Sequence, residues 1–360
     1  MSDILGIVQL FFTLVIGMYF LGRLKAESAD DKSMNDNCRA DAERLNAMRK
    51  IHLSEPMTET TRPRKESEII GQNDGVRALK SALCGKNPQH ILIYGPPGVG
   101  KTAAARLALD IAKKSMDTPF LPDAAFVEAD ATTMQYDERA IADPLIGSVH
   151  DPIYQGAGAY GNAGVPHPKL GAVSKAHGGV LFIDEIGELP SIQINRLLKV
   201  LEDRCVHFES SYYSASNKKI PVYIHEVFKN GVPADFRLIG ATTREPKDIP
   251  DAIRSRCVEI YFDPLKKDDI KTILQNAAKK VGTELSADVI NYIADYANNG
   301  RDAIKILQTL YSSISLEGRE NITLDDAKWV VKAGRYTKNN DETAKSDGKI
   351  IDISLIKPKN

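Results

Sequence analysis

One short segment combines residue types and spacing that suit the binding of a polyphosphate. It reads GPPGVGKT, from Gly95 to Thr102, and it follows the apolar stretch ILIY. Gly95, Gly98 and Gly100 permit tight turns that point successive main-chain N–H groups at an anion. Lys101 would reach the outer phosphates, Thr102 offers a hydroxyl to Mg²⁺, and a helix starting here adds its positive end. The segment predicts binding of a nucleoside triphosphate rather than a glycine turn with an incidental lysine.

A second apolar stretch, GGVLFIDE, ends in the adjacent acids Asp184 and Glu185. At the carboxyl edge of a parallel sheet, these acids would face the phosphate-binding segment. Asp184 would then hold Mg²⁺ through water, and Glu185 would polarise the water that attacks the γ-phosphate. One DE pair can also be an ordinary strand end at the surface. Its place in an alternating α/β region after Lys101 favours hydrolysis.

Three further polar positions suit roles in the same reaction. Thr243, at the tip of FRLIGATTR, can help position the attacking water. In IRSRC, Arg254 and Arg256 precede a short strand, where an arginine can reach a neighbouring subunit's γ-phosphate. Arg301 opens a helix in NNGRDAIKIL and can touch the phosphates from a helical domain. The alternatives are a solvated strand end, a surface arginine pair and an ordinary helix start.

Alternating strands and helices must position these groups. The strands we expect are HILIYG, AAFVEAD, GGVLFID, FRLIGAT and CVEIYF. Strands this apolar belong in a parallel sheet covered on both faces. After Asp263 four helical patterns follow, so the predicted fold is α/β with a C-terminal all-α domain. We expect Trp329 in the core of that domain and His177 at a strand entry rather than on a metal.

Composition restricts the class of protein. The net charge is −1, which gives no indication of nucleic-acid binding. The four cysteines lie far apart without a CxxC pair, so we expect reduced thiols in a cytosolic compartment and no zinc site.

The N-terminus differs from the rest of the chain. Ile4 to Gly22 contains no charged residue and, as a helix, would span about 28 Å, enough for a bilayer core. Arg23 and Lys25 follow at once, which predicts a retained single-pass anchor in the cell membrane with the remainder in the cytoplasm. A cleaved signal peptide and a buried soluble helix are the alternatives.

A glycine-rich segment between the predicted strands, Pro152 to Lys175, contains two tyrosines. Tyr160, flanked by Gly158 and Gly161, is the first candidate to grip an extended polypeptide, and Tyr154 is the second. The alternative is a surface loop whose tyrosines pack on the body. A second insertion, Val206 to Ala234, can form a hairpin near the same place.

In this order, GPPGVGKT, VLFIDE, GATTR, SRC and GR resemble an AAA+ ATPase, a P-loop parallel sheet with a helical lid. SEPMTETTRPRKESEIIGQ, LIGSVHDPIYQGAGAYGNAG and the N-terminal anchor resemble, more closely, the ATPase part of membrane-bound Lon proteases of the B type. The resemblance covers about residues 1 to 335 and implies ATP and Mg²⁺ as cofactors and a ring, usually a hexamer. It implies a nucleotide site formed by Gly95, Pro96, Pro97, Gly98, Val99, Gly100, Lys101, Thr102 and Arg301. It implies catalytic roles for Lys101, Asp184, Glu185, Thr243 and Arg256.

The chain departs from that family at its C-terminal end. Nothing in it resembles the serine–lysine peptidase motif, and about 25 residues follow the predicted lid. We therefore expect ATP-driven unfolding or remodelling of proteins, with a possible separate peptidase as partner.

The expected organisation is an anchor at 1–25, a linker at 26–64, a nucleotide-binding domain at 65–263, a lid at 264–335 and a tail at 336–360. Two other functions stay open: a nucleotide-gated membrane scaffold, and a DNA-associated motor, which the neutral charge and the anchor disfavour.

Overall fold

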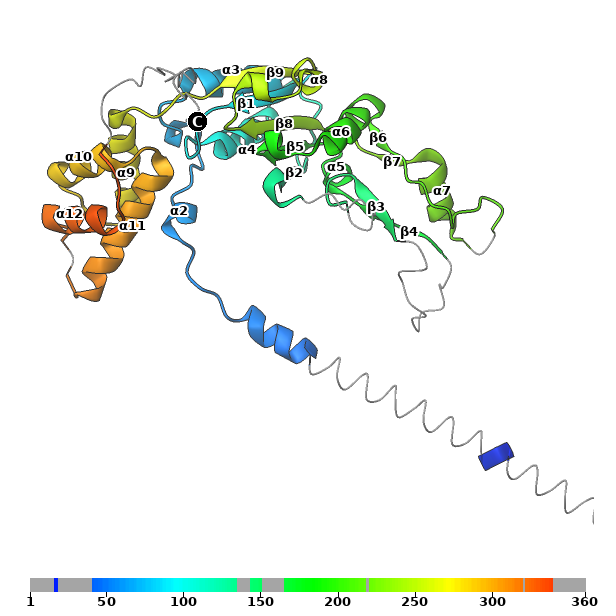
Figure 1. Ribbon diagram of the computed structural model, residues 1–360, viewed down its shortest axis with the longest axis horizontal. Helices are drawn as coiled ribbons and strands as arrows, with labels where there is room; N and C mark the ends of the chain where they lie inside the picture. Colours follow the sequence, from blue (N-terminus) through cyan, green and yellow to red (C-terminus); the bar gives the residue numbers. More distant parts are fainter. Residues whose placement is uncertain are drawn as a thin grey trace, which may run out of the picture. The chain divides into compact units, whose positions relative to one another are not determined.

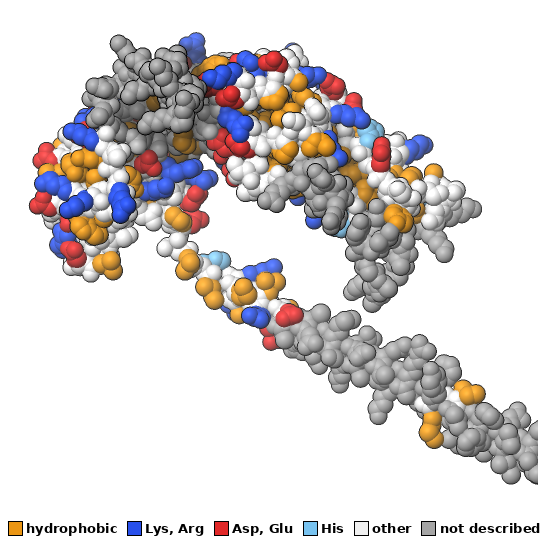
Figure 2. Space-filling view, viewed as in Figure 1, with side chains coloured by type: hydrophobic (Ala, Val, Ile, Leu, Met, Phe, Trp, Pro, Cys, Tyr) orange, Lys and Arg blue, Asp and Glu red, His pale blue; other side chains and the backbone are white. Residues whose placement is uncertain are grey.

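The computed structural model describes residues 16–18, 41–134, 143–150, 165–217, 220–319 and 321–338, and the chain forms two compact units, 1–56 and 57–360 (Figure 1). In the first unit, residues 16–18 and 41–49 are helical and exposed. The predicted anchor lies outside the described residues apart from 16–18. Within the described parts, every helix is too short or too polar to traverse a bilayer. Charged side chains of both signs are interspersed over the face in Figure 2.

A five-stranded parallel sheet forms the centre of the second unit, in the order β2–β5–β8–β1–β9. Its strands are β1 (His90–Tyr94), β2 (Phe126–Asp130), β5 (Val180–Asp184), β8 (Arg237–Thr242) and β9 (Cys257–Tyr261). Each coincides with one of the five expected stretches, so the predicted parallel sheet is confirmed. Because all strands run the same way, their carboxyl ends share one edge.

Helices cover both faces of this sheet. Ile91 and Ile93 of β1 lie on one face of the sheet, which a first pair of helices covers. Leu92 and Tyr94 lie on the opposite face, which three further helices cover. The first pair is α3 (Asn73–Leu83) and α4 (Lys101–Ala112); the other three are α5 (Ala172–Lys175), α6 (Ser191–Asp203) and α8 (Asp251–Arg254). Burial on both sides explains why the strands are almost wholly apolar.

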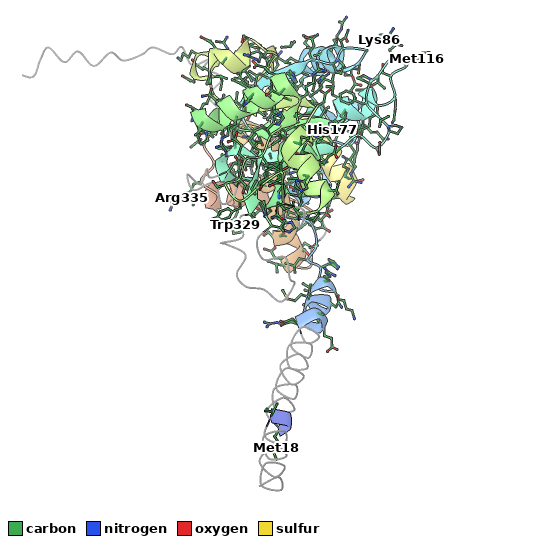
Figure 3. The ribbon with its side chains drawn as sticks, turned by 90° about the vertical axis from the view of Figure 1, so that its right-hand side faces the viewer. Met18, Lys86, Met116, His177, Trp329 and Arg335 are labelled. Atoms are coloured by element: carbon green, nitrogen blue, oxygen red, sulfur yellow. The ribbon has the colours of Figure 1, made fainter. Side chains whose placement is uncertain are left out.

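Four helices follow the sheet and have a hydrophobic core of their own. They are α9 (Lys267–Val281), α10 (Ala287–Tyr296), α11 (Gly300–Leu316) and α12 (Leu324–Ala333). We call them the lid. Met57, from the short helix α2 (Met57–Thr60), is buried in this core, and its N–H donates to Gln308 Oε1 at 3.2 Å. Trp329 is 58% exposed, so its predicted core position is wrong (Figure 3).

Two insertions extend from the sheet. In the first, β3 (Gly147–His150) pairs with β4 (His167–Leu170) in an antiparallel hairpin. In the second, the two-residue strands β6 (Cys205–Val206) and β7 (Val232–Pro233) pair and enclose α7 (Val222–Asn230). The second insertion is therefore a hairpin, as expected, with a helix at its end. Tyr154 and Tyr160 lie outside the described residues.

The segment before α3 contacts both the sheet domain and the lid. In the 3₁₀ turn Glu66–Glu68, Glu66 pairs with Lys80 of α3 at 2.6 Å and Glu68 pairs with Lys280 of α9 at 2.8 Å. Gln72 bonds the main chain of Asp263 twice, with its Nε2 donating at 2.7 Å and its Oε1 accepting at 3.0 Å. These contacts bridge the point where the sheet passes into the lid.

Candidate nucleotide-binding site

The loop from Gly95 to Gly100 connects β1 to α4 and has the backbone that its glycines predict. Gly98 and Gly100 adopt φ of 75° and 98°, in the left-handed region where a side chain is strained. A Cβ on Gly95 would lie 2.5 Å from the carbonyl oxygen of Phe262, so this position packs too closely for any side chain. Gly100 is the N-cap of α4, so the unpaired N–H groups of the first helical turn face the end of the loop.

Lys101 is buried beneath this loop, with only 7% of its surface exposed. Its Nζ donates to the carbonyl oxygens of Gly95 at 2.5 Å and Pro96 at 3.1 Å. An ammonium has three donors, so one remains for a phosphate oxygen. Burial lowers the pKa of Lys101, and the nearby carboxylates of Glu185 and Asp184 oppose that shift. The lysine is therefore in electrostatic contact with both acids.

Asp184 ends β5, and Glu185 follows it in a left-handed conformation with φ of 48°. The Glu185 N–H donates to Asp184 Oδ1 at 3.1 Å. Burial raises the pKa of Asp184, the Glu185 N–H opposes that shift, and the neighbouring Glu185 charge adds to it. Because β2 and β5 are paired at Asp130 and Asp184, a third carboxylate, which the sequence analysis missed, lies at the same edge.

Thr243 holds the side chain of Glu185. Both its main-chain N–H and its hydroxyl donate to Glu185 Oε2, each at 3.1 Å. The contact arises because β5 and β8 are neighbours and each ends at the same edge, so residues far apart in sequence meet there. The threonine is thus placed to orient the carboxylate next to the phosphate loop.

The lid reaches the loop through the start of α11. Asn299 is the N-cap of this helix, and its side chain accepts from the Asp302 N–H at 2.9 Å. A Cβ on Gly98 would lie 2.7 Å from Asn299 Oδ1, and one on Gly300 would lie 3.1 Å from Gly98 O. Arg301 comes next and contributes to lowering the pKa of Lys101, which places its charge near the lysine. Asn299 was not predicted, although its spacing to Asp302 is typical of a helix cap.

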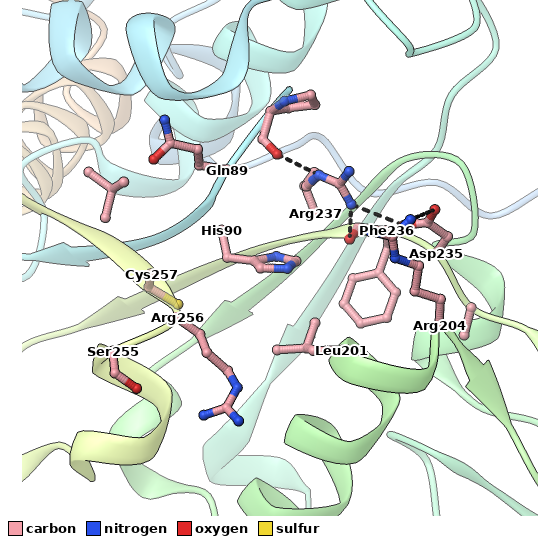
Figure 4. Close-up of a pocket in the computed structure, with 13 residues that line it drawn as sticks. Gln89, His90, Leu201, Arg204, Asp235, Phe236, Arg237, Ser255, Arg256 and Cys257 are labelled. Atoms are coloured by element: carbon pink, nitrogen blue, oxygen red, sulfur yellow. Dashed lines mark hydrogen bonds and ion pairs between the residues drawn. The ribbon is translucent and has the colours of Figure 1, made fainter. Parts of the chain in front are cut away.

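Arg254 and Arg256 lie away from the phosphate loop of their own subunit. Cys257 of β9 pairs with His90, the first residue of β1, so Arg256 lies level with Gln89, about 20 Å along the strand from Gly95 at the start of the phosphate loop. Arg256 lines a cavity of about 370 Å³ with His90, Arg204 and Arg237 (Figure 4). Its guanidinium donates to the Ala252 carbonyl at 2.8 Å and pairs with Glu202.

The residues present fit a magnesium nucleotide. Gly95 and Gly98 leave no room for a Cβ, a buried ammonium and free helix N–H groups supply positive charge, and the acids lie beside them. No cluster of three or more His, Cys, Asp or Glu that could hold a metal occurs in the described residues. Mg²⁺ commonly binds through one or two carboxylates plus phosphate oxygens, and Thr102 and Asp184 offer suitable oxygens.

Comparison with known proteins agrees with this geometry. The family described as magnesium chelatase, subunit ChlI, matches residues 66–220. Lon protease 2 of Bacillus subtilis is 54% identical over 335 residues, which cover 93% of this chain and 61% of that protein. DNA polymerase III subunit gamma of Buchnera aphidicola is 28% identical, over 69% of this chain and 58% of its own. The chain thus spans about three fifths of these relatives.

Solved structures share the fold. The RuvB Holliday junction branch migration motor of Thermotoga maritima superposes with a TM-score of 0.51 at 20% identity, covering 76% of this chain and 73% of its own. NtrX from Brucella abortus in complex with ADP also gives 0.51 at 20%, covering 81% and 62%. The sheet order, phosphate loop, paired acids and helical lid are thus those of the AAA+ fold, and the 54% identity makes the chain a relative of the Lon proteases.

Proposed function

We propose that this protein hydrolyses ATP with Mg²⁺ in a ring of identical subunits and uses the energy to unfold or remodel proteins. The observation that carries the proposal is the meeting of Lys101, Asp184, Glu185 and Thr243 at one edge of the sheet, beside the loop that starts at Gly95. Hydrolysis needs both a phosphate cradle and a placed base, and these residues would supply both.

Each residue has a separate task in this proposal. Lys101 and the N–H groups of the loop hold the phosphates, and Glu185 takes the proton of the attacking water. Thr243 keeps the Glu185 carboxylate oriented through its two hydrogen bonds. Mg²⁺, when bound, neutralises phosphate charge, with Thr102 and Asp184 as the residues that would hold it. Arg301 would contact the phosphates and so couple hydrolysis to motion of the lid.

Arg256 would act on a neighbouring subunit. It lies about 20 Å along the strand from the phosphate loop of its own chain, so it cannot serve that site. With 38% of its side chain exposed, it is available at the surface for the γ-phosphate of an adjacent copy. An arginine in this role provides large transition-state stabilisation. This division of labour requires an oligomer.

Protein substrates are favoured over DNA. The related Bacillus protein is named as a protease, and on the face in Figure 2 basic side chains are interspersed with acidic ones rather than gathered into a stripe. We propose that Tyr160, and secondarily Tyr154, grip the polypeptide. If the motor acted on DNA instead, DNA would stimulate hydrolysis with a steep salt dependence.

Membrane attachment is part of the proposal. It rests on the nineteen uncharged residues from Ile4 to Gly22 and the basic residues that follow. The test is extraction of membranes with alkaline carbonate. An anchored chain stays in the pellet and moves to the supernatant when residues 1–25 are deleted, whereas a chain that is extracted intact is not anchored.

The function is tested by Mg²⁺-dependent phosphate release from the full chain. We expect turnover that Lys101→Ala and Glu185→Gln abolish. Glu185→Gln should still bind ATP, because the loop and Lys101 are unchanged, so it can be used to capture bound proteins, including any separate peptidase. Absence of turnover in assembled wild-type protein supplied with an unfolded protein would refute the proposal.

A further inference from the structure

A polar cluster at the edge strand β9 has no part in the site described above. Glu259 accepts from Arg254 Nε at 2.7 Å and from the Tyr94 hydroxyl at 3.3 Å. Its other oxygen accepts from the Tyr261 hydroxyl at 3.2 Å. Tyr94 and Tyr261 stack with their ring centres 5.2 Å apart. One carboxylate therefore joins three elements: α8, β9 and the end of β1.

The geometry points to Glu259, Arg254 and Tyr94 as positioning residues that fix α8, the helix that precedes Arg256, relative to the phosphate loop of the same subunit. This inference rests on the proposed function, because it concerns how Arg256 is presented to a neighbouring site. It also assigns separate roles to the two arginines of IRSRC: Arg256, with 38% of its side chain exposed, would reach the neighbouring site, and Arg254 holds the helix that precedes it.

The link from Glu259 to Arg256 runs through α8. This helix has only four residues, and its Arg254 side chain pairs with both Glu259 and Asp251, the latter at 3.2 Å. Arg256 follows two residues later, with its N–H donating to the Ile253 carbonyl at 3.1 Å and its guanidinium to the Ala252 carbonyl. So short a helix has little stability of its own. Its orientation therefore depends on Arg254 and on the buried Ile253.

The link from Glu259 to the phosphate loop runs through Tyr94. Tyr94 is the last residue of β1, is 3% exposed, and directly precedes Gly95. Burial and the Glu259 charge raise the pKa of Tyr94 to about 12, so its hydroxyl remains a donor at neutral pH. The Arg254 hydrogen bond lowers the pKa of Glu259, which keeps the acceptor ionised. A movement of the loop during the nucleotide cycle would therefore be transmitted through Tyr94 and Glu259 to α8.

A double-mutant cycle tests the inference, with residual rates measured by release of radiolabelled phosphate. Glu259→Gln and Tyr94→Phe should each lower kcat about tenfold and change the Kd for ATP less than twofold. In an Arg256→Ala background the same substitutions should have no further effect, because the residue through which they act is gone. Arg254→Lys should behave as Glu259→Gln does, since lysine lacks the planar fork of arginine.

Glu128→Gln is the matched control: it removes an Arg106–Glu128 pair of the same 2.7 Å length that lies outside the cluster and should leave kcat unchanged. Equal losses in the wild-type and Arg256→Ala backgrounds would overturn the inference, as would a weakened ATP Kd with normal kcat. Tyr94→Phe keeps the ring and its stacking, so it serves if Glu259→Gln fails to fold. A wild-type chain without turnover would refute the proposed function and, with it, this inference; turnover with additive losses would refute the inference alone.

Discussion

Gly98→Ala places a methyl group directly against Asn299, at the contact between the lid and the phosphate loop. Gly98 has φ of 75°, and a Cβ there would meet Asn299 at 2.7 Å from Oδ1, 2.9 Å from Cγ and 3.2 Å from Cβ. Asn299 cannot keep its rotamer beside this methyl group. When it moves, α11 loses its N-cap bond to the Asp302 N–H. Arg301 is two residues from Asn299, so the lid is disturbed where it meets the phosphate site.

Two costs add up in this substitution. Placing alanine in the left-handed region costs about 1 kcal/mol, and loss of an asparagine cap costs about 1 kcal/mol. The sum, about 2 kcal/mol, corresponds to roughly a thirtyfold change in an equilibrium constant. We expect about 1 kcal/mol to appear as lower stability. The other half should appear as about a fivefold weaker ATP Kd, measured by isothermal titration calorimetry.

Gly282 provides a matched control because its φ of 77° is nearly the same, but nothing lies within 4 Å of the Cβ position. Gly282→Ala should lower stability by about 1 kcal/mol and leave the ATP Kd unchanged. Asn299→Gly in the Gly98→Ala background should add little, since the cap is already lost. Equal ATP affinities for the Gly98 and Gly282 variants would refute the proposed contact between the lid and the loop.

Three further predictions follow from the described contacts. Thr243→Val removes one hydrogen bond to the Glu185 carboxylate, worth about 1.5 kcal/mol at an exposed position, so kcat should fall about tenfold with KM unchanged. Thr243→Ser keeps the hydroxyl and should retain most activity. A rise in kcat for Thr243→Val would show that the bond restrains Glu185 instead. Asp184→Asn should abolish Mg²⁺-dependent turnover yet raise the melting temperature at pH 7, because burial raises the pKa of Asp184 and its ionisation therefore disfavours the folded state. This gain in melting temperature should vanish below pH 3.8, the ordinary pKa of an aspartate, where the carboxyl is protonated in both states. A gain that does not depend on pH would contradict the reasoning. Glu68→Gln breaks the ion pair with Lys280 that joins the segment before α3 to the lid. Protease cleavage near residues 263–266 should then be faster than in the wild type at low salt and equal to it at high salt, where the pair is screened. Equal cleavage rates at both salt concentrations would show that the pair does not hold the lid.

Much of the fold was predictable because its elements have strong local signals. The five sheet strands are apolar runs, and the lid helices carry apolar residues at helical spacing with clear caps such as Ser286 and Thr323. The order of the strands was not predictable, because crossover connections leave no mark in the sequence. The exposed position of Trp329 was missed because residue type was weighed above its place on the helix, two residues after the buried Ala327.

The residues of the site also differ in whether the sequence alone could identify them. Lys101, Asp184 and Glu185 could be named because loop and strand-end motifs carry chemistry at fixed spacing. Gln72, Asn299 and Glu259 could not, since their roles depend on partners that only the fold brings near: Asp263, Gly98 and Tyr94. Gln72 takes the N-cap position of α3, but its side chain bonds the main chain of Asp263 instead of the first helix N–H groups.

Mixing two impaired variants tests the shared nucleotide site most directly. Lys101→Ala has a defective phosphate loop but an intact Arg256, and Arg256→Ala has the reverse. Lys101→Ala alone should release no phosphate and Arg256→Ala alone should keep only a small residual rate. Mixed oligomers should regain a substantial part of the wild-type rate, because some interfaces then combine an intact loop with an intact arginine. A mixture that stays inactive although mixed oligomers form, or an Arg256→Ala protein with normal turnover by itself, would contradict a site shared between subunits.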